Sequence, residues 1–178
     1  MNQVLSEKTM YKSDWMQVIL AEVKLSEKQT VKWDYIKTNG FIAIVAVDDK
    51  NNVYLVKEWR VAWKDYITQI PAGTCYDTTE EYRIEQVHNE LREEIGMDAR
   101  KVEKLLGPVP MSARENNAIH VYLATDLFES KKEADADEAI EVIKMPFLEA
   151  HKLLRSGKIM TTSYTMLGID AAKERLGI

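Results

Sequence analysis

The sequence has one cysteine among 178 residues, and this scarcity excludes two common ways of stabilising a protein. A lone thiol at Cys75 cannot form a disulfide within the chain or build a zinc site from several cysteines. No apolar run approaches the roughly 18 residues that a membrane-spanning helix needs. The first ten residues also lack the apolar segment of a secretion signal. We therefore expect a cytoplasmic protein with no membrane partner.

Proline and glycine are also scarce, with 4 and 7 residues, and no linker rich in them divides the chain. Hydrophobic residues make up 46% and charged residues 30%, as in ordinary globular proteins. A chain of this length can bury a sizeable core. The net charge of −5 argues against a nucleic acid as partner, because its phosphates would be repelled.

The strongest signal lies in residues 71–97, PAGTCYDTTEEYRIEQVHNELREEIGM. A tight turn opens this stretch and a helix is predicted to follow. Thr78 or Thr79 can cap the first turn, since a hydroxyl there accepts a hydrogen bond from a free amide of the helix. Gly96 stands where helices commonly end, because glycine adopts the left-handed conformation easily.

Three glutamates, Glu90, Glu93 and Glu94, occupy one face of this predicted helix. Spacings of three and four residues place side chains one above another, so their like charges repel. A bound Mg²⁺ or Mn²⁺ would neutralise them, because both ions prefer oxygen ligands. The alternative is a solvated helix face, which is common for glutamate-rich helices.

The stretch resembles the Nudix box, G-x5-E-x7-R-E-U-x-E-E-x-G-U with U aliphatic, which marks the Nudix hydrolase family. Residues 90–97 match its last eight positions without a gap, and Glu81 can be its first glutamate. Two features depart from the motif. Asn89 replaces the arginine, and the loop from Gly73 to Glu81 is two residues longer than the motif requires.

In the family the motif arginine orients the glutamates. Losing such a supporting contact commonly lowers metal affinity or rate by about 10–100-fold. His88 and Arg92 are candidates to replace it, because both lie near the Glu81 face of the predicted helix.

Apolar periodicity predicts the remaining elements. Strands are expected at residues 15–23, 30–36, 41–47, 53–57, 66–70, 102–106, 119–125 and 140–144, and helices at 147–156 and 163–176. This order predicts the α+β class. The resemblance implies a Nudix fold, an α/β/α sandwich with a mixed β-sheet plus an N-terminal β-hairpin subregion. Residues 1–39 would form that hairpin and dimerise, and residues 40–178 would form the Nudix domain.

Residues outside the box resemble the ADP-ribose pyrophosphatase subfamily. Arg60 stands at the position of a substrate-binding arginine, and Gln69 replaces the usual glutamate before the PAG turn. Trp15 and Trp33 stand where relatives stack aromatic rings on adenine, in a site shared by two chains. Arg60 can also be read as part of a surface salt bridge. The two tryptophans can also be read as core or interface residues.

Two acidic residues are candidates to accept or orient a proton. The resemblance places Glu138 at a glutamate that acts as base or orients water, and Glu115 at a second acidic position. The alternative for Glu138 is a solvated acidic loop, since its neighbourhood is acidic throughout.

The resemblance implies a metal-dependent hydrolase of ADP-ribose or a related nucleoside diphosphate sugar. Glu90, Glu93, Glu94 and the Ala72 carbonyl would hold Mg²⁺ or Mn²⁺, and Glu138, Glu115 or Glu93 would act on the attacking water. A homodimer is expected. Two alternatives stay open: a nucleotide-sugar sensing module with weak or no turnover, and a hydrolase of GDP-mannose or dinucleoside polyphosphates.

Overall fold

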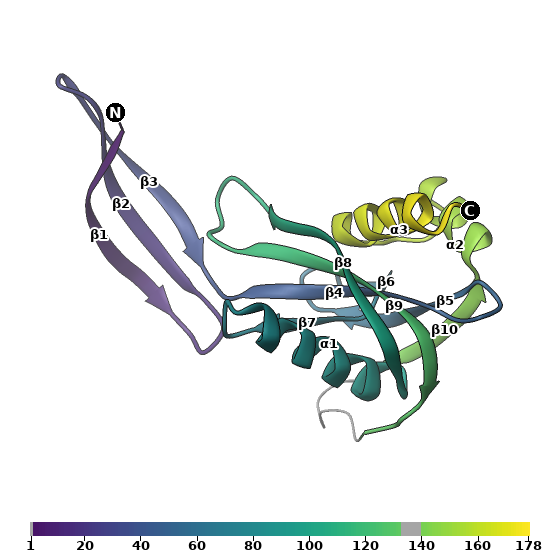
Figure 1. Ribbon diagram of the computed structural model, residues 1–178. Coiled ribbons are helices and arrows are strands. Elements are labelled where there is room, and N and C mark those ends of the chain that lie inside the picture. Colours follow the sequence, from purple (N-terminus) through teal and green to yellow (C-terminus); the bar gives the residue numbers. More distant parts are fainter. Residues whose placement is uncertain (1, 133–139) are drawn as a thin grey trace. The chain divides into compact units, whose positions relative to one another are not determined.

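The computed structural model describes residues 2–132 and 140–178. Contacts within the chain divide it into two units (Figure 1). One unit comprises Met1–Gly40 and Val109–Ala118, and the other comprises Phe41–Pro108 and Ile119–Ile178. Among the helices of the described residues, none is both long enough and apolar enough to cross a membrane.

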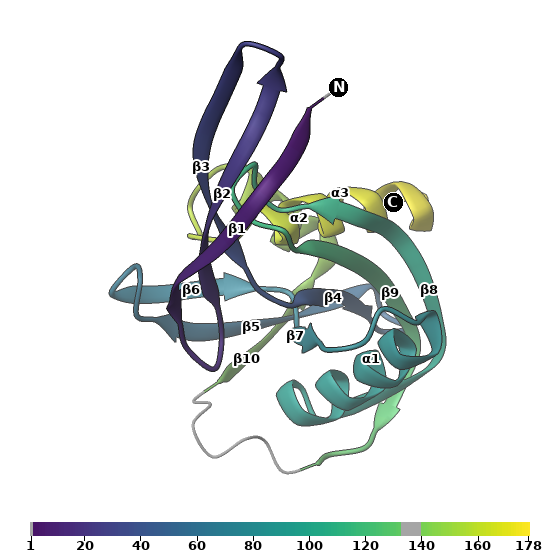
Figure 2. The same cartoon turned by 90° about the vertical axis from the view of Figure 1, so that its left-hand side faces the viewer.

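The first unit is built on a three-stranded antiparallel sheet, which Figure 2 shows as three adjacent ribbons. Its order is β1 (Gln3–Lys12), β2 (Gln17–Ser26) and β3 (Gln29–Lys37). The sequence predicts β2 and β3 but not β1. All ten residues of β1 are exposed, so no hydrophobic alternation marks this strand. Its pairing with β2 defines it instead.

The segment Val109–Ala118 belongs to the first unit through hydrogen bonds with β3. The Ile36 amide donates to the Arg114 carbonyl at 2.8 Å, and the Asn116 amide donates back to the Ile36 carbonyl at 3.1 Å. The Asn116 side chain then accepts from the Thr38 amide at 2.9 Å. These contacts tie a segment that lies within residues 40–178 to the N-terminal strands.

The second unit contains a seven-stranded sheet with the order β10-β5-β4-β9-β8, while β6 pairs with β5 and β7 pairs with β4. Its strands are β4 (Gly40–Val47), β5 (Asn52–Arg60), β6 (Asp65–Gln69), β7 (Ala72–Cys75), β8 (Met97–Pro110), β9 (Ala118–Glu129) and β10 (Glu141–Pro146). Strand β4 runs parallel to β9 and antiparallel to β5, so the sheet is mixed, as predicted.

Helices cover both faces of this sheet (Figure 1). Ile42 and Ile44 of β4 pack into one core with Leu91 of α1 (Glu80–Glu94). On the opposite face, Gly168 of α3 (Ser163–Leu176) lies so close to Val45 that an added β-carbon would come within 3.2 Å of it. The side chains of β4 alternate between these two layers. The predicted α/β/α sandwich is therefore confirmed.

The predicted helices are confirmed with small changes at their ends. Thr79 caps α1 by accepting from the Tyr82 amide at 3.4 Å. The helix ends at Glu94, and Gly96 follows it with a left-handed φ of 68°. Helices α2 (Phe147–Arg155) and α3 complete the chain.

Candidate active site

The C-terminal half of α1 lies against the PAG turn, whose Ala72 and Gly73 are the first two residues of β7. The Glu90 carboxylate is so close to Gly73 that its Oε1 lies 1.7 Å from where a β-carbon on Gly73 would be. A side chain at position 73 would therefore have to displace the Glu90 carboxylate, which occupies its space. The turn and the helix face form one surface.

Glu94 contacts the same turn from the next position on that helix face. The Ala72 amide donates a hydrogen bond to its Oε2 at 3.2 Å. Glu94 is only 6% exposed, although carboxylates are almost never this buried unless they have partners. Glu90 and Glu94 thus converge on two consecutive residues, Ala72 and Gly73.

Glu93 points to a different partner. Its Oε1 accepts a charge-assisted hydrogen bond from the Lys132 ammonium. Lys132 follows the end of β9 and lies beside the end of α1, because its amide donates to the Arg92 carbonyl at 3.1 Å. The third glutamate of the face is therefore engaged by a lysine that sequence spacing does not reveal.

The arrangement suits a hard divalent cation. Within the described residues, no three carboxylate, imidazole or thiolate groups are grouped closely enough to hold a metal ion as they stand. Two carboxylates nonetheless meet at the Ala72–Gly73 turn, and the missing side chain of Gly73 leaves room for one of them. Carboxylate and backbone oxygens are the ligands that Mg²⁺ and Mn²⁺ prefer. Glu93 could join them if it left Lys132.

A second pair of charges lies at the end of β5. Arg60, at the end of β5, forms an ion pair with Glu58 at 2.6 Å. Tyr164 of α3 senses all three charges. The pKa of Tyr164 is raised to about 12, chiefly by burial; the Glu94 and Glu58 carboxylates also raise it, while the Thr162 hydrogen bond and the charge of Arg60 lower it. Arg60 and the buried Glu94 therefore both act on the hydroxyl of Tyr164.

Tyr164 also links α3 to the strand before the turn. Its hydroxyl donates to Gln69 Oε1 at 2.8 Å, and both residues are buried. One residue further, the Ile70 amide donates to Thr165 Oγ1 at 3.1 Å. These contacts fix the strand that leads into Ala72. The sequence gives no signal for Tyr164, which reads as an ordinary helix residue.

Comparisons with known proteins find relatives of similar sequence and a solved structure of similar fold. No family model matches the chain. An ADP-ribose pyrophosphatase of Bacillus subtilis is 28% identical over 160 residues, covering 88% of this chain and 85% of that protein. A methanol dehydrogenase activator of Bacillus methanolicus is 29% identical over 142 residues, covering 78% and 75%. A solved structure of an ADP compounds hydrolase, 18% identical, superposes with a TM-score of 0.85 over 99% of this chain and 94% of that one.

These similarities support the resemblance to the Nudix hydrolase family that the sequence shows. The glutamate face of α1 matches the helix of the Nudix box, and Gly73 of the PAG segment stands at the glycine that opens this motif. The likeness to the solved structure shows that the fold is shared over nearly the whole chain.

Asn89, which replaces the arginine of the Nudix box, lies in a local network of hydrogen bonds. Arg92 donates from Nη2 to Asn89 Oδ1 at 2.8 Å and from Nε to the His88 carbonyl at 2.9 Å. His88 in turn contacts Asp98 through Nδ1 at 2.5 Å. The two candidates for the missing arginine are thus bonded to each other, to Asn89 and to Asp98.

The first turn of the Nudix helix places Glu80, rather than Glu81, in a polar network. Glu80 accepts from the Tyr122 hydroxyl at 2.7 Å and from Lys104 at 3.1 Å. The Tyr122 hydrogen bond lowers the pKa of Glu80, although burial opposes it. Glu81, the motif position by spacing, is exposed. Helical phase explains the difference, because adjacent residues lie about 100° apart around a helix.

The predicted adenine-stacking residues lie in the first unit. Trp15, in the turn between β1 and β2, is 72% exposed, and Trp33 of β3 is 51% exposed. A core role is therefore excluded for both. Trp33 lies opposite Ala21 on the neighbouring strand. The Trp15 carbonyl accepts a hydrogen bond from the Thr38 hydroxyl, and Thr38 lies five residues after Trp33. Two such positions are roughly 15 Å apart along a strand.

The two acidic candidates are placed differently. Glu115 pairs with Ile36 through a backbone bridge and belongs to the first unit, whereas the Nudix helix belongs to the second. Glu138 lies outside the described residues. Of the predicted site residues, the structure therefore brings Glu90 and Glu94 together at Ala72 and Gly73.

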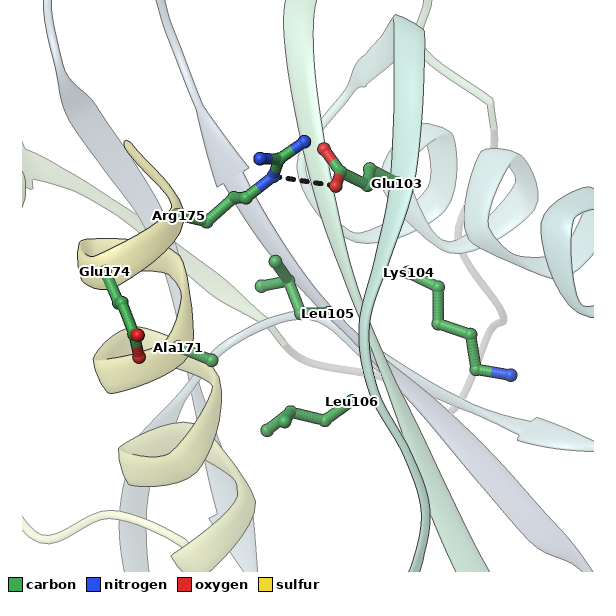
Figure 3. A pocket seen from close by; sticks show the side chains of 7 residues that line it. All are labelled: Glu103, Lys104, Leu105, Leu106, Ala171, Glu174 and Arg175. Atoms are coloured by element: carbon green, nitrogen blue, oxygen red, sulfur yellow. Dashed lines mark ion pairs between the residues drawn. The ribbon is translucent and has the colours of Figure 1, made fainter. Parts of the chain in front are cut away.

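A groove in the second unit lies between β8 and α3 (Figure 3). Its volume is about 590 Å³, and Arg175 Nε pairs across it with Glu103 at 2.7 Å. Lys104 extends from the other side of β8, toward Glu80. The predicted site residues are not among the seven described residues that line this groove, so it is separate from the Nudix glutamates.

Proposed function

We propose that this Nudix protein hydrolyses the diphosphate linkage of ADP-ribose, or of a related nucleoside diphosphate sugar, to two monophosphates. The chain is a Nudix diphosphohydrolase, and its similarity to an ADP-ribose pyrophosphatase supports this choice of substrate. One observation carries the proposal: Glu90 and Glu94 converge on the Ala72–Gly73 turn. This convergence creates an oxygen-rich site on a rigid helix and turn.

Mg²⁺ or Mn²⁺ is the proposed cofactor. Glu90, Glu94 and the Ala72 carbonyl would hold it, with Glu93 as a further ligand. A bound divalent cation neutralises phosphate oxygens and lowers the pKa of a coordinated water. The residues of the chain supply the rest of the site. The hydrogen bond from the Ala72 amide holds the Glu94 carboxylate in position before any ligand arrives.

Arg60 is the proposed contact for the diphosphate. A guanidinium fits two phosphate oxygens at once, which makes arginine well suited to this role. Its ion pair with Glu58 keeps it near Tyr164 and Glu94. This position supports a role beyond a surface salt bridge, because the charge of Arg60 acts within the same group as a buried Nudix glutamate.

The attacking water needs a group that accepts or orients its proton. Glu138 is the proposed residue, with Glu115 and Glu93 as the alternatives. The high exposure of Trp15 and Trp33 supports their proposed role as stacking surfaces for adenine. Each stack is worth about 1–3 kcal/mol. A homodimer in which one chain offers Trp15 and its partner offers Trp33 would bring the rings together.

A panel assay tests the proposal. Purified protein, stripped of metal with chelator, is supplied with Mg²⁺ or Mn²⁺ and with ADP-ribose, GDP-mannose and a dinucleoside polyphosphate. We expect release of AMP from ADP-ribose with a kcat/KM at least tenfold above the other substrates, and no release without metal. A higher kcat/KM for GDP-mannose or the polyphosphate would show that ADP-ribose is not the preferred substrate. The protein would still be a diphosphohydrolase. Turnover in the presence of chelator would show that the reaction does not require a metal ion.

A second candidate function is a module that binds a nucleotide sugar with little turnover. Two observations favour it: Asn89 replaces an arginine of the Nudix box, and one relative is named as an activator of another enzyme. Calorimetry with ADP-ribose alongside the assay separates the two functions. Tight binding of ADP-ribose without release of AMP would select the sensing module.

A further inference from the structure

Glu93 stands where a negative charge is least favourable on α1. It is the penultimate residue of the helix, and the C-terminal end of a helix carries a partial negative charge. Glu90 and Glu94, one turn before it and next to it, are also acidic. Like charges three or four residues apart destabilise a helix further. A cation near Glu93 therefore stabilises this end of α1.

Lys132 provides this cation from another part of the chain. Two backbone hydrogen bonds hold its segment against the helix end: the Ser130 amide donates to the Gly96 carbonyl at 3.0 Å, and the Lys132 amide donates to Arg92 at 3.1 Å. The Lys132 ammonium then contacts Glu93 Oε1. The Glu93 side chain is 21% exposed and that of Lys132 is 52% exposed, so the lysine can leave at little cost.

We infer that Lys132 is the counter-ion of Glu93 in the metal-free protein, and that a divalent cation must displace it to gain Glu93 as a ligand. This inference rests on the proposed function. The ammonium and the metal compete for the same carboxylate oxygen, because Lys132 donates directly to it. Lys132 is therefore a positioning residue that lowers metal affinity and keeps α1 neutralised when the site holds no metal.

The chain offers a matched control in Lys131. It carries the same charge at the neighbouring position and is exposed, and its β-carbon lies beside Gly96. Calorimetry of Mn²⁺ binding to metal-stripped protein compares wild type, Lys132→Met and Lys131→Met. We expect Lys132→Met to bind Mn²⁺ about two- to fivefold more tightly, the range that a partly exposed ion pair supports. Lys131→Met should stay within about 1.5-fold of wild type.

A second pair of variants tests whether the effect passes through Glu93. In a Glu93→Gln background, Lys132→Met should no longer change the Mn²⁺ affinity. Equal affinities for Lys132→Met and Lys131→Met would overturn the inference, and so would a persisting effect in the Glu93→Gln background. Either result would leave the proposed hydrolase intact if ADP-ribose is still cleaved.

A failure of the proposed function can also be distinguished from a failure of the inference about Lys132. Wild-type protein that binds Mn²⁺, shows the Lys132 effect and does not cleave any substrate would overturn the proposed function alone. Wild-type protein that binds no Mn²⁺ would overturn both.

Discussion

The Glu90 carboxylate occupies the space that a side chain on Gly73 would fill. The two residues are 17 positions apart, yet a side chain cannot be added at position 73 unless Glu90 moves. The obstructing atoms belong to the far end of a flexible side chain and not to the backbone. A larger residue at position 73 should therefore displace Glu90 without disrupting the fold.

Gly73→Ala tests this relationship. We expect the variant to fold with a melting temperature within about 3 °C of wild type, because Glu90 can rotate away. Its Mn²⁺ affinity and its kcat should each fall by about tenfold or more, a loss of roughly 1.4 kcal/mol. Calorimetry, turnover and thermal melts measure these effects. Unchanged Mn²⁺ affinity would show that Glu90 does not contact the metal.

Glu94→Gln removes a charge and keeps the shape. The glutamine retains an oxygen that can accept from the Ala72 amide, so the fold should be intact. We expect kcat to fall more than tenfold, because a neutral amide is a poor ligand for a hard cation. Binding of Mn²⁺ to the folded state should raise the melting temperature of wild type more than that of the variant. If the variant retained more than about a tenth of the wild-type kcat, Glu94 would not be a ligand of the metal.

Restoring the motif arginine at position 89 should not by itself raise the Mn²⁺ affinity. Asn89 accepts from Arg92, so Asn89→Arg removes that acceptor and brings two guanidinium groups together. We expect the single variant to stay within about twofold of wild type in Mn²⁺ affinity. The double variant Asn89→Arg with Arg92→Gln should gain roughly tenfold, the lower end of such supporting effects. A gain in the single variant would show that Arg92 does not obstruct the position.

Trp33→Ala tests the proposed adenine site and the proposed homodimer. Stacking far from the bond that breaks acts equally on ground and transition states, so KM should rise roughly tenfold while kcat changes little. Trp63→Ala is the matched control, since Trp63 is a 64% exposed tryptophan in the turn between β5 and β6. A mixture of Trp33→Ala and Glu94→Gln chains should recover activity if the strand is donated by the partner. A monomer at micromolar concentration in ultracentrifugation would contradict the shared site.

The β4–β5 turn should make stability depend on pH in acid. Burial raises the pKa of Asp48, but hydrogen bonds from Lys144 and Asn52 outweigh it and lower the pKa from 3.8 to about 2. A carboxyl group with a lowered folded pKa stabilises the fold above its unfolded pKa and loses that contribution as the pH falls. Stability should therefore fall between about pH 4 and pH 2. Urea unfolding of Asp48→Asn should show a weaker dependence in this window; an identical profile would contradict the assignment.

Local sequence determined the elements whose signals come from neighbouring residues. The α1 helix follows from a capping threonine, a glycine after its end and a carboxylate face between them. Helix α3 begins at Ser163 and ends at Leu176, as its pattern predicts. Strand β4 is buried on both faces and reads as a continuous apolar run. In each case residues close in sequence carry the information, because periodicity and capping act within a few residues.

Tertiary structure decided which partners these elements meet. Strand β1 has no buried face, so only its pairing with β2 defines it. Lys132 reaches Glu93, and Tyr164 reaches Gln69, across 39 and 95 positions. No spacing rule predicts such pairs, because packing of separate elements brings them together. The sequence by itself therefore determined the glutamate face, and only the folded chain decided that two of its carboxylates turn to Ala72 and Gly73 while the third is held by a lysine.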